Sequence, residues 1–181
     1  MQNFVDHINS HPPKHYDVII VGAGPAGTSC ALALAKSNLK ILLVDKESFP
    51  RDKICGDAVV GRSIKTLFKF APQLIDELRE FEQKERISTT RIFINQKKPF
   101  NIYWNNEAYC IKRIHFDALL LKHALINGQQ TSINYNTIIN DVTHINGIIM
   151  VGNKESNTYF SANIVVAADG SQSFWQKNSS I

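Results

Sequence analysis

A turn containing three glycines, flanked by two apolar strand patterns, constrains this chain more than any other feature of its sequence. Residues 18–21 are β-branched and apolar, and they run directly into a Gly-x-Gly-x-x-Gly spacing. Gly22 permits a tight turn, Gly24 permits close approach of a pyrophosphate, and Gly27 permits close packing of the following helix on the strand. The pattern therefore predicts a strand–turn–helix unit that holds a dinucleotide.

The residues on either side of the turn support this prediction. The helix would begin at Pro25 and Ala26, where unpaired N–H groups and the positive end of the helix dipole attract phosphate. A second apolar strand ends at Asp45, eighteen residues after Gly27, where a carboxylate can accept hydrogen bonds from a ribose diol. We therefore assign to the cofactor site Gly22, Gly24, Pro25, Ala26, Gly27, Asp45 and the adjacent Lys46.

Length and charge narrow the class of protein. The 181 residues are enough for one well-buried domain, so we expect a single domain over 1–181, with a flexible lead-in at 1–15. The net charge of +4 comes from Lys and Arg spread along the chain. Nucleic-acid binding requires a clustered basic stripe with interleaved aromatics, and we expect no nucleic-acid partner.

The cysteines and histidines show no metal-ligand spacing. Cys30, Cys55 and Cys110 lie in unlike contexts, the six histidines are scattered, and we expect no metal site and a reducing compartment. His123 falls on the apolar face of a helical pattern, which favours a packed histidine over a ligand. Residues 18–35 are uncharged and could be read as an export signal or membrane span. Only the dinucleotide interpretation explains their glycines, so we expect a cytoplasmic protein.

The remaining chain mixes helical and strand patterns. In chain order, we expect a strand at 17–21, a helix at 25–37, a strand at 40–45, a loop at 46–57, helices at 58–69 and 73–85, strands at 91–94, 100–104 and 108–111, a helix at 115–127, a strand at 131–135, a meander over 137–160 and a strand at 164–168. This order predicts an α/β fold with a Rossmann-like βαβ unit, a parallel sheet and an antiparallel β insertion.

Four segments resemble the geranylgeranyl reductases, which are relatives of the FAD-dependent aromatic hydroxylases. They are Val-Gly-Ala-Gly-Pro-Ala-Gly at 21–27, Phe-Pro-Arg-Asp-Lys-Ile-Cys-Gly-Asp at 49–57, Arg-Ile-His-Phe-Asp-Ala-Leu-Leu at 113–120 and Val-Val-Ala-Ala-Asp-Gly-Ser-Gln-Ser at 165–173. The segment at 49–57 is specific to the reductases, whereas the first and last are shared more widely. The resemblance covers 16–173 and implies FAD as cofactor, with NAD(P)H as a candidate electron donor.

The resemblance also implies roles for residues outside the glycine turn. Arg51, Cys55 and Gly56 would lie along the flavin, and a partly ionised, accessible Cys55 would be the candidate catalytic residue. Arg113 would contact FAD through its planar fork, although pairing with Glu107 or Asp117 is an alternative. Asp169 and Gly170 would reach the cofactor from the end of a buried strand, or form an ordinary turn.

The implied activity is hydride transfer from reduced flavin to an isoprenoid double bond, with a lipid-like substrate reached by contact with a membrane surface. Family members continue beyond the position of Ile181, so we expect this chain to be an incomplete, front portion of such an enzyme. Two alternatives stay open. One is a flavin monooxygenase or halogenase, and the other is a non-catalytic FAD-binding fragment.

Overall fold

The structure is a computed structural model that describes residues 12–95, 98–145, 147–171 and 173–177. The chain divides into two compact units. Unit 1 comprises residues 1–48 and 124–181, and unit 2 comprises residues 49–123. Each unit is described by itself. Helix α5 (Arg113–Asn127) contains the boundary between them.

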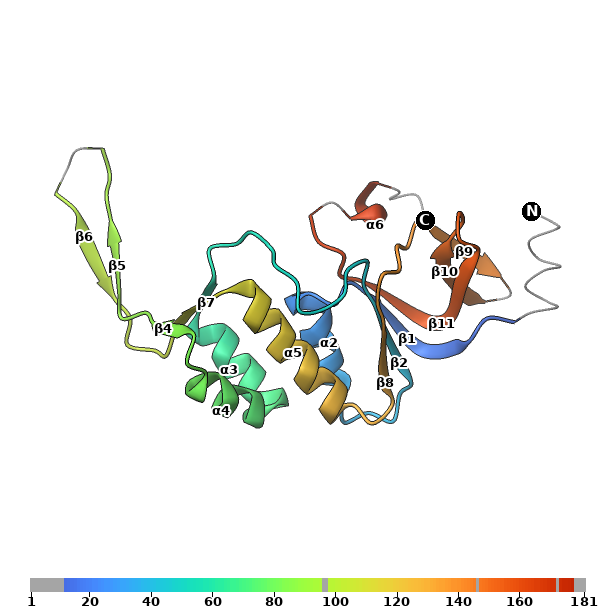
Figure 1. The fold of residues 1–181 in the computed structure, drawn as a ribbon, viewed down its shortest axis with the longest axis horizontal. Coiled ribbons are helices and arrows are strands. Elements are labelled where there is room, and N and C mark those ends of the chain that lie inside the picture. Colours follow the sequence, from blue (N-terminus) through green and yellow to red (C-terminus); the bar gives the residue numbers. More distant parts are fainter. Residues whose placement is uncertain (1–11, 96–97, 146, 172, 178–181) are drawn as a thin grey trace. The chain divides into compact units, whose positions relative to one another are not determined.

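Unit 1 is built around a six-stranded sheet in the order β8-β2-β1-β11-β10-β9 (Figure 1). Strands β8 (Thr131–Asn134), β2 (Ile41–Val44), β1 (His15–Val21) and β11 (Thr158–Ala167) are parallel to one another. Strand β10 (Ile148–Asn153) is antiparallel to both β11 and β9 (Asp141–Ile145). Val18 is paired with Ile41 on one side and with Ile164 on the other. The predicted α/β class, with its parallel sheet and antiparallel addition, is confirmed.

The central strands are apolar because both faces of this parallel part are covered. Ile19, Ile20 and Leu43 are fully buried, and Ile19 belongs to a core cluster with Leu42, Val151 and other residues. Burial of each such side chain contributes roughly 1.5–3 kcal/mol relative to exposure. This core fixes the carboxyl ends of β1 and β2, where the predicted cofactor residues lie.

Helix α2 (Pro25–Leu34) begins where predicted and ends three residues earlier than predicted. The Ala35 N–H donates to the Leu32 carbonyl, and the Ser37 N–H donates to the Leu34 carbonyl. These short-range bonds tighten the last turn, and the Ser37 hydroxyl adds a bond of 2.6 Å to the Leu34 oxygen. The polar end of the helical pattern therefore forms a turn.

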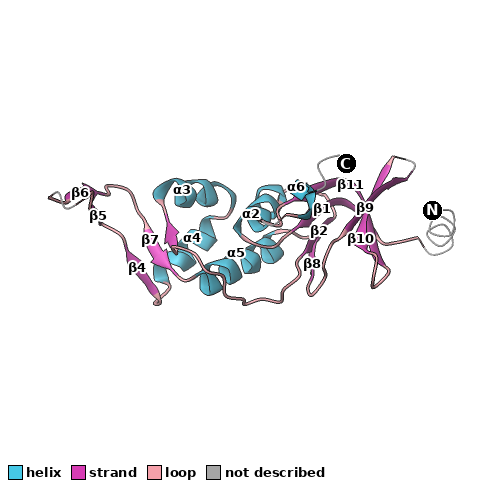
Figure 2. Cartoon of the chain, turned by 90° about the horizontal axis from the view of Figure 1, so that it is seen from above, coloured by secondary structure: helices cyan, strands magenta, loops and turns pink. Residues whose placement is uncertain are grey.

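Unit 2 combines two helices with a three-stranded sheet of order β3-β7-β4 (Figure 2). Its elements are β3 (Ala58–Val59), α3 (Gly61–Phe70), α4 (Pro72–Glu80), β4 (Lys84–Arg86), β5 (Thr89–Ile92), β6 (Phe100–Tyr103), β7 (Tyr109–Ile111) and the part of α5 up to residue 123. Helices α3 and α4 bury one apolar face each, including Ile64, Leu67 and Ile75. The helical periodicity of both segments is thus confirmed.

Two sequence-based boundaries and one expected strand pairing in unit 2 are corrected. Residues 58–59 form a strand before α3, and residues 84–86 form a strand after α4, because both pair with β7. Short strands of this kind depend on a distant partner and leave little local signal. Strand β7 was expected to continue the hairpins, but it pairs with β3 and β4 instead of β6. Its Tyr109 and Ile111 are buried there.

Strands β5 and β6 pair only with each other among the described residues, as a two-stranded antiparallel ribbon (Figure 1). This confirms the predicted hairpin between the strand patterns at 91–94 and 100–104. Helix α5 begins at Arg113, two residues earlier than predicted, so Arg113 stands in its first turn. In the described ranges, no helix combines the length and apolar character needed to cross a membrane.

Candidate functional site

The glycine turn in unit 1 connects β1 to α2 against the end of β11. The Gly22 N–H donates to the Val44 carbonyl at 2.7 Å, and Gly22 has a φ of +104°. A Cβ at this position would lie 2.3 Å from the Ala168 carbonyl oxygen, and a Cβ at Gly27 would lie 1.8 Å from the Gly22 carbonyl oxygen. Both contacts are closer than any real carbon–oxygen contact, so the turn requires glycine at both positions.

Asp45 fixes the turn from the second strand. Its Oδ2 accepts a hydrogen bond of 2.7 Å from the Ala23 N–H, and its Oδ1 accepts one of 2.9 Å from the Glu47 N–H. The residue is 6% exposed. Each carboxylate oxygen has a further lone pair, so Asp45 can still accept a ribose hydroxyl while it holds the turn. The adjacent Lys46 is exposed.

The start of α2 has the character expected of a phosphate site. Gly24 is the N-cap, and no side chain caps this end of the helix. The first turn has Pro25 at its start and no acidic residue, and Ala26 is exposed. The Thr28 hydroxyl donates backward to the Gly24 carbonyl at 2.9 Å. The positive end of the helix dipole therefore faces no negative side chain of its own first turn.

Asp169 follows β11, which runs beside β1. The Ala168 N–H donates to the Val21 carbonyl at 2.8 Å, and Gly170 has a φ of +88°. Asp169 accepts a 2.9 Å bond from the Phe174 N–H at the start of α6 (Phe174–Lys177). One oxygen of the carboxylate is therefore committed to the backbone, a role that the sequence reasoning missed. The Ser173 hydroxyl accepts a further hydrogen bond from the Trp175 N–H in the same helix start.

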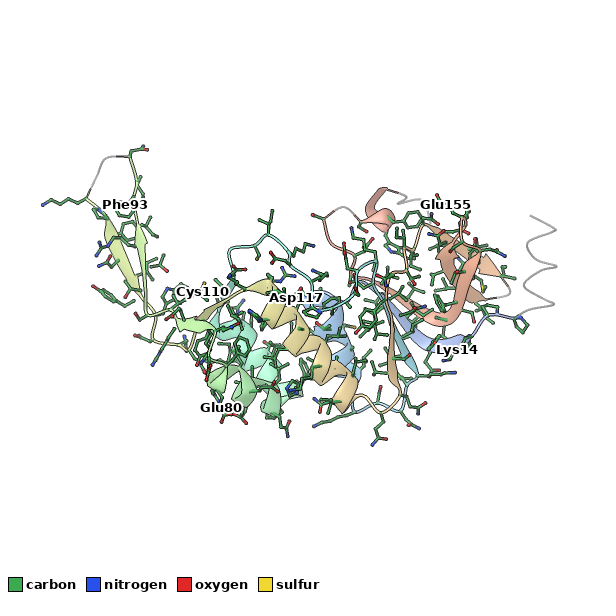
Figure 3. The ribbon with its side chains drawn as sticks, in the orientation of Figure 1. Lys14, Glu80, Phe93, Cys110, Asp117 and Glu155 are labelled. Atoms are coloured by element: carbon green, nitrogen blue, oxygen red, sulfur yellow. The ribbon has the colours of Figure 1, made fainter. Side chains whose placement is uncertain are left out.

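In unit 2, a buried carboxylate holds two of the predicted cationic residues together. Asp117 in α5 is fully buried and is labelled in Figure 3. Arg113 donates to both of its oxygens, at 2.6 and 2.7 Å, and Arg51 Nη1 lies 3.5 Å from Oδ2. Hydrogen bonding to Asp117 raises the pKa of Arg113 above its ordinary value. Two guanidinium groups share one carboxylate, which leaves a net positive charge.

Cys55 lies beside this cationic pair and is exposed. A hydrogen bond from the Asp57 backbone and one from Arg113 lower the pKa of the Cys55 thiol below its ordinary value, against a smaller effect of desolvation. The thiol is therefore accessible, and its ionisation is favoured relative to an ordinary cysteine, which is the direction that the catalytic prediction for Cys55 requires. Gly56 next to it faces open space, with no atom within 4 Å of a Cβ built there.

The predicted residues thus form one group in each unit. In unit 1, the glycine turn, Asp45 and Asp169 meet at the carboxyl ends of neighbouring strands, and in unit 2, Arg51 and Arg113 meet at Asp117. Of the two partners considered for Arg113, Asp117 is the one present, whereas Glu107 pairs with Arg79. The organising role of Asp117 was not predicted, although its four-residue spacing from Arg113 on a helix was a usable signal.

The chemistry of the unit 1 group fits a dinucleotide. The turn carries no side chain at Gly22 or Gly27, the helix end presents N–H donors, and Asp45 supplies an acceptor beside them. These are the donors and acceptors that a pyrophosphate and a ribose require. His123, in contrast, is buried and bonded to Glu77, which agrees with its prediction as a packed residue.

Comparison with known proteins establishes the family. A family model described as pyridine nucleotide–disulphide oxidoreductase matches residues 16–174. The chain belongs to this family. The match covers the whole glycine turn, Asp45, Arg113 and Asp169. It places the chain among the FAD-dependent oxidoreductases.

Individual relatives of this oxidoreductase span several activities. The uncharacterized protein Mbar_A1602 of Methanosarcina barkeri is 31% identical over 87% of this chain and 38% of its own length. A 1H-pyrrole-2-carbonyl-[peptidyl-carrier protein] brominase of Pseudoalteromonas luteoviolacea is 30% identical over 64% of the chain and 28% of its own. A digeranylgeranylglycerophospholipid reductase of Sulfolobus acidocaldarius is 56% identical over 24% of the chain and 10% of its own.

A solved structure, the myxobacterial FAD-dependent halogenase CndH, superposes with a TM-score of 0.75 at 22% identity, over 87% of this chain and 38% of that one. At this identity the likeness concerns the fold, which is the FAD-binding Rossmann-like fold. The oxidoreductase chain spans little more than a third of the length of the Methanosarcina relative and of this halogenase.

Proposed function

We propose that this chain is the FAD-binding portion of a flavin-dependent reductase that saturates isoprenoid double bonds. The observation that carries this assignment is the loop at 49–57, where Cys55 lies beside the Arg51–Asp117–Arg113 group. The short match of 56% identity to a digeranylgeranylglycerophospholipid reductase supports it. We further propose NAD(P)H as the source of electrons and the cytoplasm as the location.

Unit 1 would hold the adenosine end of FAD. The N–H groups at the start of α2 would bind the pyrophosphate, the glycines would let it approach, and Asp45 would accept from the ribose. Lys46 is exposed directly after Asp45 and can add positive charge near the phosphates. The turn is fixed on three sides by Val44, Asp45 and Ala168, so little ordering is needed when a ligand binds.

Unit 2 would supply the residues that act during the reaction of the flavin with its substrate. FAD, when bound and reduced, supplies a hydride equivalent, and the saturated product also needs one proton for each double bond. Cys55 is the group in this loop that can supply that proton, because its thiol is exposed and its pKa is lowered. Arg113 would hold Cys55 in place and balance the charge that remains on sulfur after the proton has left.

A flavin halogenase or monooxygenase is the second candidate, because the CndH fold and the brominase relative point to it. The two reactions differ in what consumes the electrons of the reduced flavin. A reductase transfers them to an alkene and needs no oxygen, whereas a halogenase or monooxygenase transfers them to oxygen. Anaerobic and aerobic reoxidation rates therefore separate the candidates.

The direct test supplies the chain with FAD, reduces it under anaerobic conditions and adds a glycerophospholipid that carries geranylgeranyl chains. The proposal predicts reoxidation of the flavin and a product heavier by two hydrogens per double bond. Cys55→Ser should slow this reaction, and Cys110→Ser, at an exposed cysteine in β7, is the matched control. Reoxidation that requires oxygen, with no saturated lipid formed, would overturn the reductase assignment.

A further inference from the structure

The carboxylate of Asp117 joins the loop at 49–57 to helix α5 within unit 2. It is fully buried, where a charge without partners is strongly disfavoured. Arg113, one turn earlier in α5, donates to both of its oxygens at 2.6 and 2.7 Å. Arg51 approaches from the loop, with Nη1 at 3.5 Å from Oδ2. The two arginine side chains are themselves only 14% and 16% exposed, so this ion group is shielded from water.

A buried ion group of this kind contributes little net stability, because desolvation of its charges offsets most of their attraction. Its effect is on geometry. Nε and Nη2 of Arg113 both bind Asp117, which fixes the orientation of the guanidinium plane. Arg51 also stacks over the Phe49 ring, with its guanidinium carbon 4.7 Å from the ring centroid. Both cations are therefore held in one position.

Cys55 lies on the part of the loop that depends on these contacts. Residues 52–56 are all exposed, so the contacts at the two ends of this stretch determine where it lies. At one end, Arg51 is bound to Asp117. At the other end, the Asp57 carbonyl accepts a hydrogen bond of 2.9 Å from the backbone of β7. The ion group thus anchors the stretch that carries the candidate proton donor.

Arg113 is the charged group that acts on the Cys55 thiol. It hydrogen-bonds to the sulfur and supplies a positive charge beside it, whereas Asp57 and Gly56 act through their backbones. All of these interactions favour the thiolate. Asp117 is bonded to Arg113, so a change at Asp117 reaches the thiol by moving this one guanidinium group.

We propose that Asp117 is a positioning residue, which holds the Arg113 guanidinium against Cys55 and keeps the thiol in its reactive arrangement. The proposal rests on the proposed function for the use of the thiol proton. The positioning itself is measured on the thiol, without flavin or lipid. Absence of lipid reduction would therefore count against the proposed function alone, whereas an unaltered thiol in the variants below would count against the positioning role.

Two possible effects of Asp117 on the thiol have opposite signs. As a negative charge, Asp117 offsets the charge of Arg113, so its removal would favour the thiolate and move alkylation of Cys55 to lower pH. As a positioning residue, it keeps the Arg113 hydrogen bond on the sulfur, so its removal would move alkylation to higher pH. The direction of the shift separates the two roles.

The test is the pH profile of Cys55 alkylation by iodoacetamide, with Cys110 followed in the same molecule by peptide mass mapping. Asp117→Asn keeps the volume of the side chain and should move the Cys55 profile to higher pH. Alkylation at pH 7 should be roughly threefold slower, the size of effect expected when an ion pair is partly exposed to solvent. In an Arg113→Gln background, Asp117→Asn should add no further shift.

Arg113→Lys tests the same point while the buried carboxylate keeps a cationic partner. Lysine retains the charge but lacks the planar fork that binds both oxygens, so the Cys55 profile should again move to higher pH. Asp76→Asn, which removes an exposed carboxylate paired with Arg79, is the matched control and should leave the profile unchanged. A native profile in Arg113→Lys would overturn the proposal. So would an unchanged or lower-pH profile in Asp117→Asn, or an undiminished shift in the Arg113→Gln background.

Discussion

At Gly22, the backbone conformation and the packing both disfavour any residue that has a Cβ. The residue has a φ of +104°, and a Cβ would meet the Ala168 carbonyl at 2.3 Å. We expect Gly22→Ala to lower the free energy of unfolding by about 2 kcal/mol or more, since strained backbone alone costs of order 1–3 kcal/mol. Urea denaturation measures the change.

Gly147 is the matched control for this substitution, because its φ is +80° and no atom lies within 4 Å of a Cβ built there. Gly147→Ala should cost only about 1 kcal/mol, from the backbone alone. Equal losses at the two positions would show that the contact between the glycine turn and β11 is not close in solution.

The ionisation of Cys55 can be measured through its reactivity. The Asp57 backbone and Arg113 lower the pKa of this thiol, so Arg113→Gln should raise the pKa and move the pH profile of alkylation by iodoacetamide to higher pH. Peptide mass mapping follows each cysteine separately, and the exposed Cys110 serves as an internal control in the same molecule. If the pH profile of alkylation at Cys55 is unchanged in Arg113→Gln, Arg113 does not lower the pKa of the Cys55 thiol.

At the scale of elements, Glu77 links helices α4 and α5 within unit 2. Lys122 donates to it at 2.7 and 2.9 Å, and His123 Nε2 lies 2.9 Å from Oε2. The hydrogen bond from Lys122, followed by that from His123, lowers the pKa of Glu77 below its ordinary value of 4.5. The pair therefore contributes stability above pH 4.5, and this contribution is lost as the pH falls through the lowered pKa.

As the pH falls from neutrality through the lowered pKa of Glu77, the free energy of unfolding should decrease less for Glu77→Gln than for the native chain. The difference should stay below about 1 kcal/mol, because the side chain is partly exposed and solvent screens the pair. Denaturation curves at several pH values measure it, and Glu80→Gln, on the same helix, removes the same charge as a control. Identical acid limbs for Glu77→Gln and the native chain would rule out this linkage.

The elements also show what the sequence can predict. The β1–α2–β2 unit was predictable because apolar strands, glycine spacing and the start of the helix are all local features. The pairing of β7 with β3 and β4 was not, because short strands take their partners from the tertiary structure. The same limit applies to single residues. Asp45 was predicted from its position, but the commitment of Asp169 to the Phe174 N–H depends on a turn that the sequence does not define.

At the scale of the whole molecule, the chain carries two groups of candidate residues, one in each compact unit, and spans little more than a third of the relatives that it matches. Family membership rests on the match over 16–174. The residues proposed to bind the adenosine end of FAD are contained in unit 1, so binding of FAD can be tested separately from catalysis.

Calorimetric titration of the purified chain with FAD tests the central claim most directly. The account predicts one FAD per chain, hydrogen-exchange protection at residues 22–27 when FAD is bound, and much weaker binding after Asp45→Ala, because the ribose acceptor and the hydrogen bond to Ala23 are both lost. A chain that remains folded but shows neither heat of binding nor protection of the glycine turn at saturating FAD would contradict it.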